Sequence, residues 1–198
     1  MKPTLIAYNN DTSVKLHDFF ESCGDEMKQY CYDNQITHTL LTPPNLTEKD
    51  VMTLMEKHDV CFIAAHGDSD GIGNEKDDDV ISIHTTNYNL EKKVVYCISC
   101  YSALNLCPYL MQIGAHVFVG YNNTFEVTGE HSPFIVSALS GLKMLLAGAD
   151  VKTAREQMNQ SYNEQIDSMD KSGNVWEAMS LLHDKEALVF EGNDDFHI

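Results

Sequence analysis

Two apolar runs that each lead into a polar residue constrain the fold of this chain most. Residues 59–65 (DVCFIAA) stop at His66, and residues 93–98 (KVVYCI) end two positions before Cys100. Near-continuous runs of this length, rich in β-branched and aromatic residues, are typical of strands that are covered on both faces of a parallel sheet. We therefore expect two buried parallel strands whose carboxyl ends carry a histidine and a cysteine.

The rest of the chain alternates between short apolar runs and longer amphipathic stretches. Thr47 and Asp50 form the start signal of one helix, and Gly24 is a candidate break in another. The acidic stretch 68–79 is predicted to be a solvated loop, with a short edge strand at 80–83. The other expected strands cover 3–8, 36–41, 116–121 and 187–190, and the expected helices cover 12–33, 103–112, 133–147, 151–169, 175–182 and a segment that opens at Thr47. Strands that alternate with helices predict one α/β domain over residues 1–198, with a mostly parallel central sheet flanked by helices.

The negative charge of the chain limits the classes of partner that it can bind. Thirty Asp and Glu against thirteen Lys and Arg give a formal net charge of −17, which repels nucleic acid and anionic membranes. The same charge attracts basic peptides, although acidity also serves solubility alone. No stretch approaches the roughly 18 apolar residues of a membrane span, and the first apolar run is too short for a secretory signal, so we expect a cytoplasmic protein. The six cysteines lie irregularly and mostly in apolar runs, which is typical of reduced core thiols.

His66 and Cys100 are the candidate catalytic residues. Polar groups at the carboxyl ends of neighbouring parallel strands gather at one edge of the sheet, where adjacent strands lie about 4.8 Å apart. A thiolate is a strong nucleophile, and an imidazole can take its proton and later protonate a leaving amine. Gly67 presents an N–H that no side chain shields, so together with the N–H of Cys100 it can form an oxyanion hole. The helix expected after Cys100 would lower the pKa of the thiol.

These motifs resemble those of the caspase-like (clan CD) cysteine peptidases, most nearly the CHAT type found in bacteria and in separase-like enzymes. CFIAAHGD, at 61–68, is similar to the family's strand that ends in His-Gly, and VVYCISCYSA, at 94–103, is similar to its strand that leads to the nucleophile. LNLCPYLMQIGAHVFVGY, at 104–121, resembles the helix and strand that follow in the family. The resemblance extends more loosely to the helices that end near Met169, and it implies a caspase-like three-layer sandwich.

The resemblance also implies a function. It assigns His66 as general base and acid, Gly67 as an oxyanion donor and Cys100 as the nucleophile of a cysteine endopeptidase. It implies a peptide or protein substrate, no cofactor or metal, and control by a regulatory or sensor protein, because bacterial members of the group often work beside one.

The substrate pocket departs from the family's pattern. Metacaspase-like members place an acidic residue two positions before the nucleophile, where this chain has Ile98, and caspases place an arginine where it has Tyr101. Our candidate substrate-binding residues are Asp68, Tyr101, Tyr121 and Glu126. Because an acidic P1 side chain needs a cationic partner when it is buried, the acidic surroundings predict a basic or small neutral P1 residue.

The cysteines allow two other interpretations. Cys97 and Cys100 form a C-x-x-C pair, as in redox sites, but Cys97 is expected inside the strand, where it would be a buried wall residue. A zinc site from Cys97, Cys100, Cys107 and His66 would lack the paired spacing of zinc knuckles. Both interpretations are weaker than the catalytic one.

The acidic stretch after His66 partly matches a calcium-binding loop. Four residues fall at EF-hand positions one, three, six and twelve, namely Asp68, Asp70, Gly73 and Asp79. Ile72 stands at position five, where a ligand oxygen is required, and no flanking helices are expected. A solvated loop is the better interpretation.

A protein of another class also fits the fold. A catalytically inactive, peptidase-like interaction module would use its acidic face to dock a basic partner, since a fold does not determine a function. A decayed active site usually lacks one of its residues. The presence of both His66 and Cys100 therefore favours an enzyme.

Overall fold

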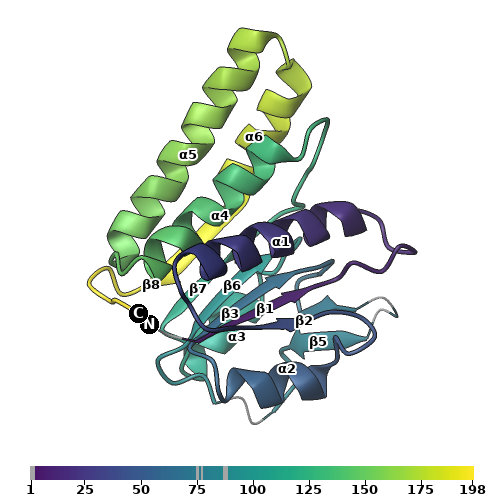
Figure 1. Ribbon diagram of the computed structural model, residues 1–198, viewed down its shortest axis with the longest axis vertical. Coiled ribbons are helices and arrows are strands. Elements are labelled where there is room, and N and C mark those ends of the chain that lie inside the picture. Colours follow the sequence, from purple (N-terminus) through teal and green to yellow (C-terminus); the bar gives the residue numbers. More distant parts are fainter. Residues whose placement is uncertain (1–2, 75, 77, 87–88) are drawn as a thin grey trace.

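The computed structural model describes residues 3–74, 76, 78–86 and 89–198. A six-stranded sheet forms its centre (Figure 1). Its strands are β1 (Thr4–Tyr8), β2 (His38–Leu41), β3 (Val60–Ala64), β6 (Val94–Ile98), β7 (Val117–Tyr121) and β8 (Leu188–Gly192). The strand order is β2-β1-β3-β6-β7-β8, and every neighbouring pair is parallel except β7 and β8. The mostly parallel α/β sheet of the prediction is confirmed.

Helices cover both faces of the sheet, as Figure 1 shows. The helices are α1 (His17–Asp33), α2 (Glu48–Met55), α3 (Leu106–Gln112), α4 (Ser132–Leu146), α5 (Val151–Ser172) and α6 (Val175–Ala187). Because side chains alternate along a strand, the central strands supply two cores. Phe62 and Tyr96 lie in the core with residues of α1, α4 and α5, whereas Ile63 and Cys97 lie in the core with residues of α2 and α3. Burial on both faces explains why these strands are apolar at nearly every position.

The register of β3 and β6 decides where their ends lie. Ala64 pairs with Ile98, and the Ala65 N–H donates to the Ile98 carbonyl at 3.3 Å. His66 and Cys100 each follow this last pair by two residues. The sheet therefore places His66 and Cys100 at the same edge and at the same level.

The first helix differs from the prediction in two ways. It begins at His17 rather than at residue 12, because Leu16 adopts a left-handed conformation with φ of 62° that an α-helix does not contain. Gly24 does not break it. A Cβ at this position would lie 2.3 Å from Cδ1 of Tyr8, so the glycine lets the helix pack directly against the Tyr8 ring.

The acidic stretch after His66 is more ordered than predicted. Residues 75 and 77 of this stretch lie outside the described residues, but β4 (Gly71–Gly73) pairs with β5 (Asp79–Ser82) as an antiparallel two-stranded sheet. Ile72, Val80 and Ile81 are fully buried against the α2 and α3 side of the central sheet. The short strand predicted at 80–83 is present as β5, whereas the loop prediction was wrong at 71–73, where β4 pairs with it and Ile72 is buried.

The C-terminal helices extend away from the sheet in Figure 1. α6 runs to Ala187, five residues beyond the predicted end, because Asp184 and Ala187 continue its buried side one and two turns beyond Leu181. Within the described part of the chain, none of the helices combines the length and the apolar content that crossing a bilayer requires.

Candidate active site

His66 and Cys100 line one small pocket at the carboxyl ends of β3 and β6. The pocket has a volume of about 40 Å³ and an apolar wall. Its lining consists of Leu16, Phe20, Ala65, His66, Ile98, Ser99, Cys100 and Phe125. No hydrogen bond joins these two described side chains; each is held by a backbone group of another segment. Their place in one pocket is what brings them together.

The imidazole of His66 is oriented by the turn before α1. Its Nε2 lies 2.7 Å from the Lys15 carbonyl oxygen, and its ring meets the Phe20 ring edge-on at 5.3 Å. A carbonyl can only accept a hydrogen bond, so Nε2 carries the proton in the neutral ring. Nδ1 is then the unprotonated nitrogen and can act as a base.

The Cys100 thiol is partly buried and contacts the loop after β7. The Phe125 N–H donates to Sγ at 3.3 Å. Burial raises the pKa of the Cys100 thiol above its ordinary value, the Asp184 and Glu126 carboxyl groups add to this effect, and the Phe125 N–H opposes it. The thiol is therefore protonated at neutral pH and needs a base to become a nucleophile.

The helix expected from residue 103 begins three residues later. Residues 100–105 form turns, Tyr101 has a positive φ of 55°, and α3 starts only at Leu106. The dipole of a helix falls off within its first turn, so α3 does not supply the predicted stabilisation of a thiolate. The Phe125 N–H and the backbone N–H of Cys100 itself lower the pKa of the thiol in this structure.

Gly67 lies where the ends of β3, β4 and β6 meet. It faces Ile72 as an isolated bridge, in which the Asp68 N–H donates to the Gly71 carbonyl. Among the described residues, no backbone carbonyl accepts the N–H of Gly67 or of Cys100. Two N–H groups beside a thiol that are not engaged by backbone carbonyls are the donors that an oxyanion hole requires.

A methyl group at Gly67 would not fit this site, and we expect Gly67→Ala to lower kcat/KM by about 10²-fold or more. The added Cβ would lie 2.2 Å from Ser99 Oγ and 2.9 Å from the Gly71 carbonyl oxygen, so the strand ends must move apart. Steady-state kinetics with a peptide substrate, together with thermal melts, measure the effect. Gly148→Ala is the control, since open space surrounds Gly148 and only its positive φ is disturbed. An unchanged kcat/KM in Gly67→Ala would contradict the expected oxyanion role.

The structure separates the four candidate substrate-binding residues. Tyr121 is fully buried, and its hydroxyl lies 2.9 Å from the Tyr162 hydroxyl in the core, so substrate does not reach it and that prediction was wrong. Glu126 is exposed on the loop beside Cys100, where its carboxyl contacts α6. Tyr101 is half-buried in the turn after the nucleophile position, and its N–H donates to the Asn123 carbonyl.

Asp68 belongs to a second pocket on the other side of His66. This pocket has a volume of about 180 Å³. It is lined by His66, Gly67, Asp68, Gly71, Gly73, Asn74 and Asp79. It therefore offers backbone groups and two carboxylates directly beside the candidate dyad.

Helix α6 holds the loop that contacts Cys100, and the sequence analysis missed this role. Asp184 Oδ1 accepts the Glu126 N–H at 2.8 Å, and His183 Nε2 donates to the Thr124 carbonyl at 3.1 Å. Burial raises the pKa of the Asp184 carboxyl to about 9, so this side chain is neutral at pH 7, and its Oδ2 has no partner among the described residues. Its position three residues after Leu181, on the buried face, is the signal that could have revealed it.

The cysteine arrangement does not favour a redox or zinc site. Cys97 is fully buried in the α2 and α3 core with Cys61 and Cys107, and all six cysteines are free. Within the described ranges, no three His, Cys, Asp or Glu side chains are placed to hold a metal ion together. Asp70, one of the calcium-loop candidates, instead accepts hydrogen bonds from Asn105 and Ser69.

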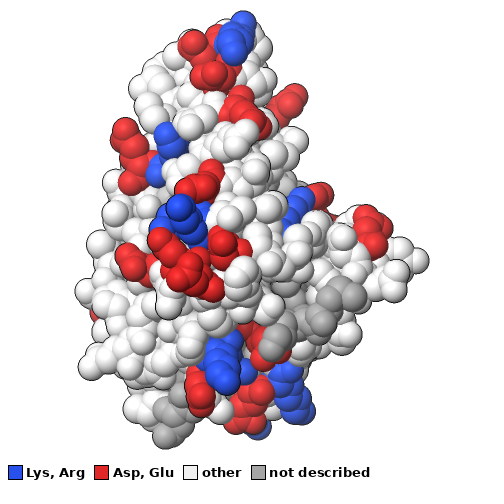
Figure 2. All heavy atoms as spheres, turned by 90° about the vertical axis from the view of Figure 1, so that its left-hand side faces the viewer, with Lys and Arg blue, Asp and Glu red and all other residues white. Residues whose placement is uncertain are grey.

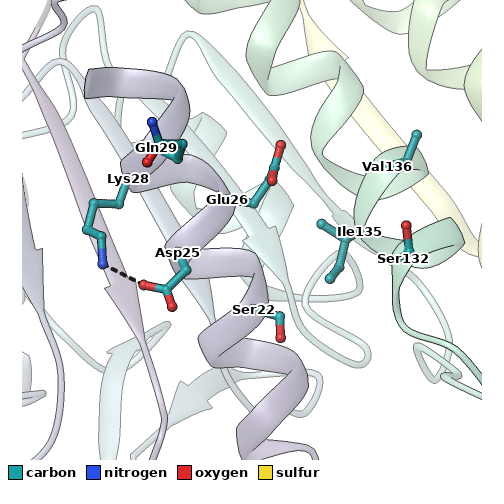
Figure 3. A pocket seen from close by; sticks show the side chains of 8 residues that line it. All are labelled: Ser22, Asp25, Glu26, Lys28, Gln29, Ser132, Ile135 and Val136. Carbon is teal, nitrogen blue, oxygen red and sulfur yellow. Dashed lines mark hydrogen bonds and ion pairs between the residues drawn. The ribbon is translucent and has the colours of Figure 1, made fainter. Parts of the chain in front are cut away.

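A larger hollow lies between α1 and α4 (Figure 3). Its volume is about 610 Å³, and its lining residues are Ser22, Asp25, Glu26, Lys28, Gln29, Ser132, Ile135 and Val136. Its carboxylates are already paired, since Asp25 bonds Lys28 at 2.6 Å and Glu26 bonds Lys143 at 2.5 Å. We assign no ligand to this hollow.

Acidic and basic side chains are mixed on one face of the molecule. On the face that Figure 2 shows, Lys and Arg side chains lie among the Asp and Glu side chains. This face therefore does not present one continuous acidic patch of the kind that an acidic docking module would use.

Comparison with known proteins supports the fold. The sequence matches no family model, and a search of curated proteins found no match. The structure is similar to a chain of the crystal structure of the Saccharomyces cerevisiae separase–securin complex, with a TM-score of 0.58 and 14% identity. The similarity covers 96% of this chain and 12% of that one, so this chain corresponds to a small part of a much larger chain. The protein thus has the caspase-like α/β fold, and the comparison does not distinguish a CHAT type.

Proposed function

We propose that this protein is a cysteine endopeptidase, related to the separase-like and CHAT types, in which Cys100 is the nucleophile and His66 the general base and acid. One observation carries the proposal. The two side chains follow the last paired residues of adjacent parallel strands and line a single pocket in a caspase-like fold. The N–H groups of Gly67 and Cys100, which no backbone carbonyl accepts among the described residues, support it, because they would form an oxyanion hole at the same point.

The proposed reaction proceeds through an acyl-enzyme. His66 Nδ1 takes the thiol proton while Cys100 Sγ bonds to the carbonyl carbon of the scissile peptide. The N–H groups of Gly67 and Cys100 donate to the oxygen, which carries the negative charge of the tetrahedral intermediate. The C–N bond then breaks, and the imidazolium protonates the leaving amine. Water that transfers a proton to His66 hydrolyses the thioester and regenerates the thiol.

The main alternative is an inactive interaction module with the same fold. A thiol-reactive peptide probe distinguishes the two, because an activated Cys100 reacts with it much faster than a free thiol does. We expect wild-type protein to be labelled at Cys100 and His66→Ala to be labelled slowly. Equal labelling of both proteins would favour the inactive module.

We expect the enzyme to cleave after Arg or Lys at least about tenfold faster than after Asp. The pocket beside His66 contains the carboxylates of Asp68 and Asp79, which attract a cationic P1 side chain and repel an anionic one. Matched peptides that differ only in a P1 Arg, Leu or Asp measure the preference.

Two controls test the electrostatic cause of this preference. Asp79→Asn should reduce the advantage of Arg over Leu, and added salt should do the same, because screening weakens exposed charges. A clear preference for Asp would contradict the electrostatic argument. A preference for Leu would instead indicate that the apolar pocket of Leu16, Phe20 and Phe125 receives the P1 side chain.

A further inference from the structure

Helix α6 exposes an apolar stripe to solvent. Val175, Met179 and Leu182 repeat at the spacing of one helix face and are 50%, 56% and 43% exposed, and the neighbouring Trp176 is 74% exposed. We call these four residues the α6 stripe. Of the eight large apolar side chains that are exposed among the described residues, these four lie on a single helix. Exposed apolar side chains that cluster, with a tryptophan among them, are typical of a protein interface.

The opposite face of α6 holds the loop that contacts Cys100. Ser180 and Asp184 are buried there, and they bond the Glu126 carboxylate at 3.3 Å and its backbone N–H at 2.8 Å. The next N–H in this loop, that of Phe125, donates to Cys100 Sγ. Hydrogen bonds from the buried face of α6 to the loop, and from the loop to Cys100, thus link this helix to the candidate nucleophile. The α6 stripe lies on the other face of the same helix.

Carboxylates border the α6 stripe on both sides. On the α5 side, Lys185 of α6 donates to Asn163, and Asp167 and Asp170 follow Asn163 on the same face of α5. Asp167 is paired with Lys171 at 3.7 Å, which leaves Asp170 as the carboxylate offered to a partner on this side. On the other side, the loop after β7 carries the exposed Glu130, and the carboxylate of Glu126 in the same loop accepts a hydrogen bond from Ser180 of α6. Figure 2 shows acidic side chains, with a basic side chain among them, near the end of the molecule where α5 and α6 meet, at the top of that view. A surface of this kind complements apolar residues that are flanked by Lys and Arg.

We propose that the α6 stripe docks a basic amphipathic helix of another protein, and that docking increases the reactivity of Cys100. A second copy of this chain would bring the same carboxylates against each other, and an anionic membrane would be repelled, so neither is the occupant. A docked helix would stabilise α6 and the loop contacts that aim the Phe125 N–H at Sγ. The docking site is independent of the proposed peptidase function. The functional meaning of the effect on Cys100 rests on that proposed function.

Selection from a displayed library of helical peptides against the full chain tests the docking site. We expect the enriched peptides to combine an apolar stripe with flanking Lys or Arg. Trp176 is the only tryptophan of the chain, so binding should shift its fluorescence emission to shorter wavelength. Met179→Glu should weaken binding at least tenfold, while Tyr32→Glu, a control at a side chain that is 75% exposed on α1, should leave binding unchanged.

Alkylation of Cys100 by iodoacetamide, followed by mass spectrometry, tests whether docking increases the reactivity of Cys100. This measurement does not depend on peptide cleavage. The tightest selected peptide should raise the alkylation rate about fivefold, and Met179→Glu should remove this effect. A bound peptide that leaves the rate unchanged would refute the coupling. Enriched peptides that are acidic or insensitive to Met179→Glu would overturn the docking proposal, as would dimers or vesicle binding that Met179→Glu abolishes. A protein that docks the peptide but cleaves nothing would refute the peptidase function alone.

Discussion

Replacing Cys100 with alanine should abolish peptide cleavage, and replacing His66 with alanine should lower kcat by at least about 10⁴-fold. The sulfur of Cys100 forms the bond to the substrate in the acyl-enzyme. Because burial raises the pKa of the Cys100 thiol, the thiol is protonated at neutral pH and needs His66 as a base. Cleavage of a diverse peptide pool by each variant measures the loss. The double variant should be no worse than Cys100→Ala, since the two residues act as one unit.

A matched cysteine variant separates catalysis from packing in this experiment. Cys97 precedes Cys100 by three residues but lies in the opposite core. Cys97→Ala should lower the free energy of unfolding by about 1 kcal/mol through lost packing and retain most of the cleavage activity in folded protein. Retained cleavage in Cys100→Ala would rule out Cys100 as the nucleophile.

Replacing Asp184 with asparagine should change how stability depends on pH. Burial raises the pKa of Asp184 to about 9 in the folded chain, above its value of 3.8 when exposed, so the folded state holds a proton that the unfolded state has lost between these two values. This carboxyl therefore stabilises the fold at low pH, and its contribution falls by up to about 1.4 kcal/mol per pH unit as the pH rises toward 9. Asp184→Asn, which stays neutral, should lose less stability than the wild type between pH 5 and pH 9. Urea unfolding across this range measures the difference.

Two further variants show whether Asp184 acts through its acceptor oxygen. The asparagine oxygen can still accept the Glu126 N–H, whereas Asp184→Leu leaves that N–H without its acceptor and should slow alkylation of Cys100. Asp170→Asn, at an exposed carboxylate on α5, controls for the loss of one charge. Parallel pH profiles of the wild type and Asp184→Asn would contradict the predicted protonated carboxyl.

Local sequence patterns predicted the strands better than the ends of helices. The apolar runs at 59–65 and 93–98 indicated β3 and β6, because strands buried on both faces need apolar side chains at every position. The predicted starts of α1 and α3 were too early, by five and three residues. The left-handed conformation of Leu16 sets the start of α1, and the turn after Cys100 sets the start of α3. No local sequence pattern indicated either feature.

The substrate-binding candidates show the limit of position in the sequence. Asp68 lies beside His66 as expected, because it follows the same strand end by a few residues. Tyr121 ends a strand of the same sheet, yet its side chain enters the core and bonds Tyr162 from α5. Alternation along β7 puts Tyr121 on the same face as Val117 and Val119, and the packing of α5 over that face is what buries its hydroxyl.

The sequence by itself determined the α/β class, the mostly parallel sheet and the arrival of His66 and Cys100 at adjacent strand ends. Each of these follows from short-range periodicity and from the pairing of buried strands, which a single chain displays residue by residue. Only the tertiary structure decided which groups serve the pair: the Lys15 carbonyl on His66, the Phe125 N–H on Cys100 and the α6 carboxyl of Asp184 behind that loop. These contacts join segments that lie from 25 to 58 residues apart, and backbone groups supply most of them. Since every residue type carries the same backbone N–H and carbonyl, packing alone selects the ones that reach the site.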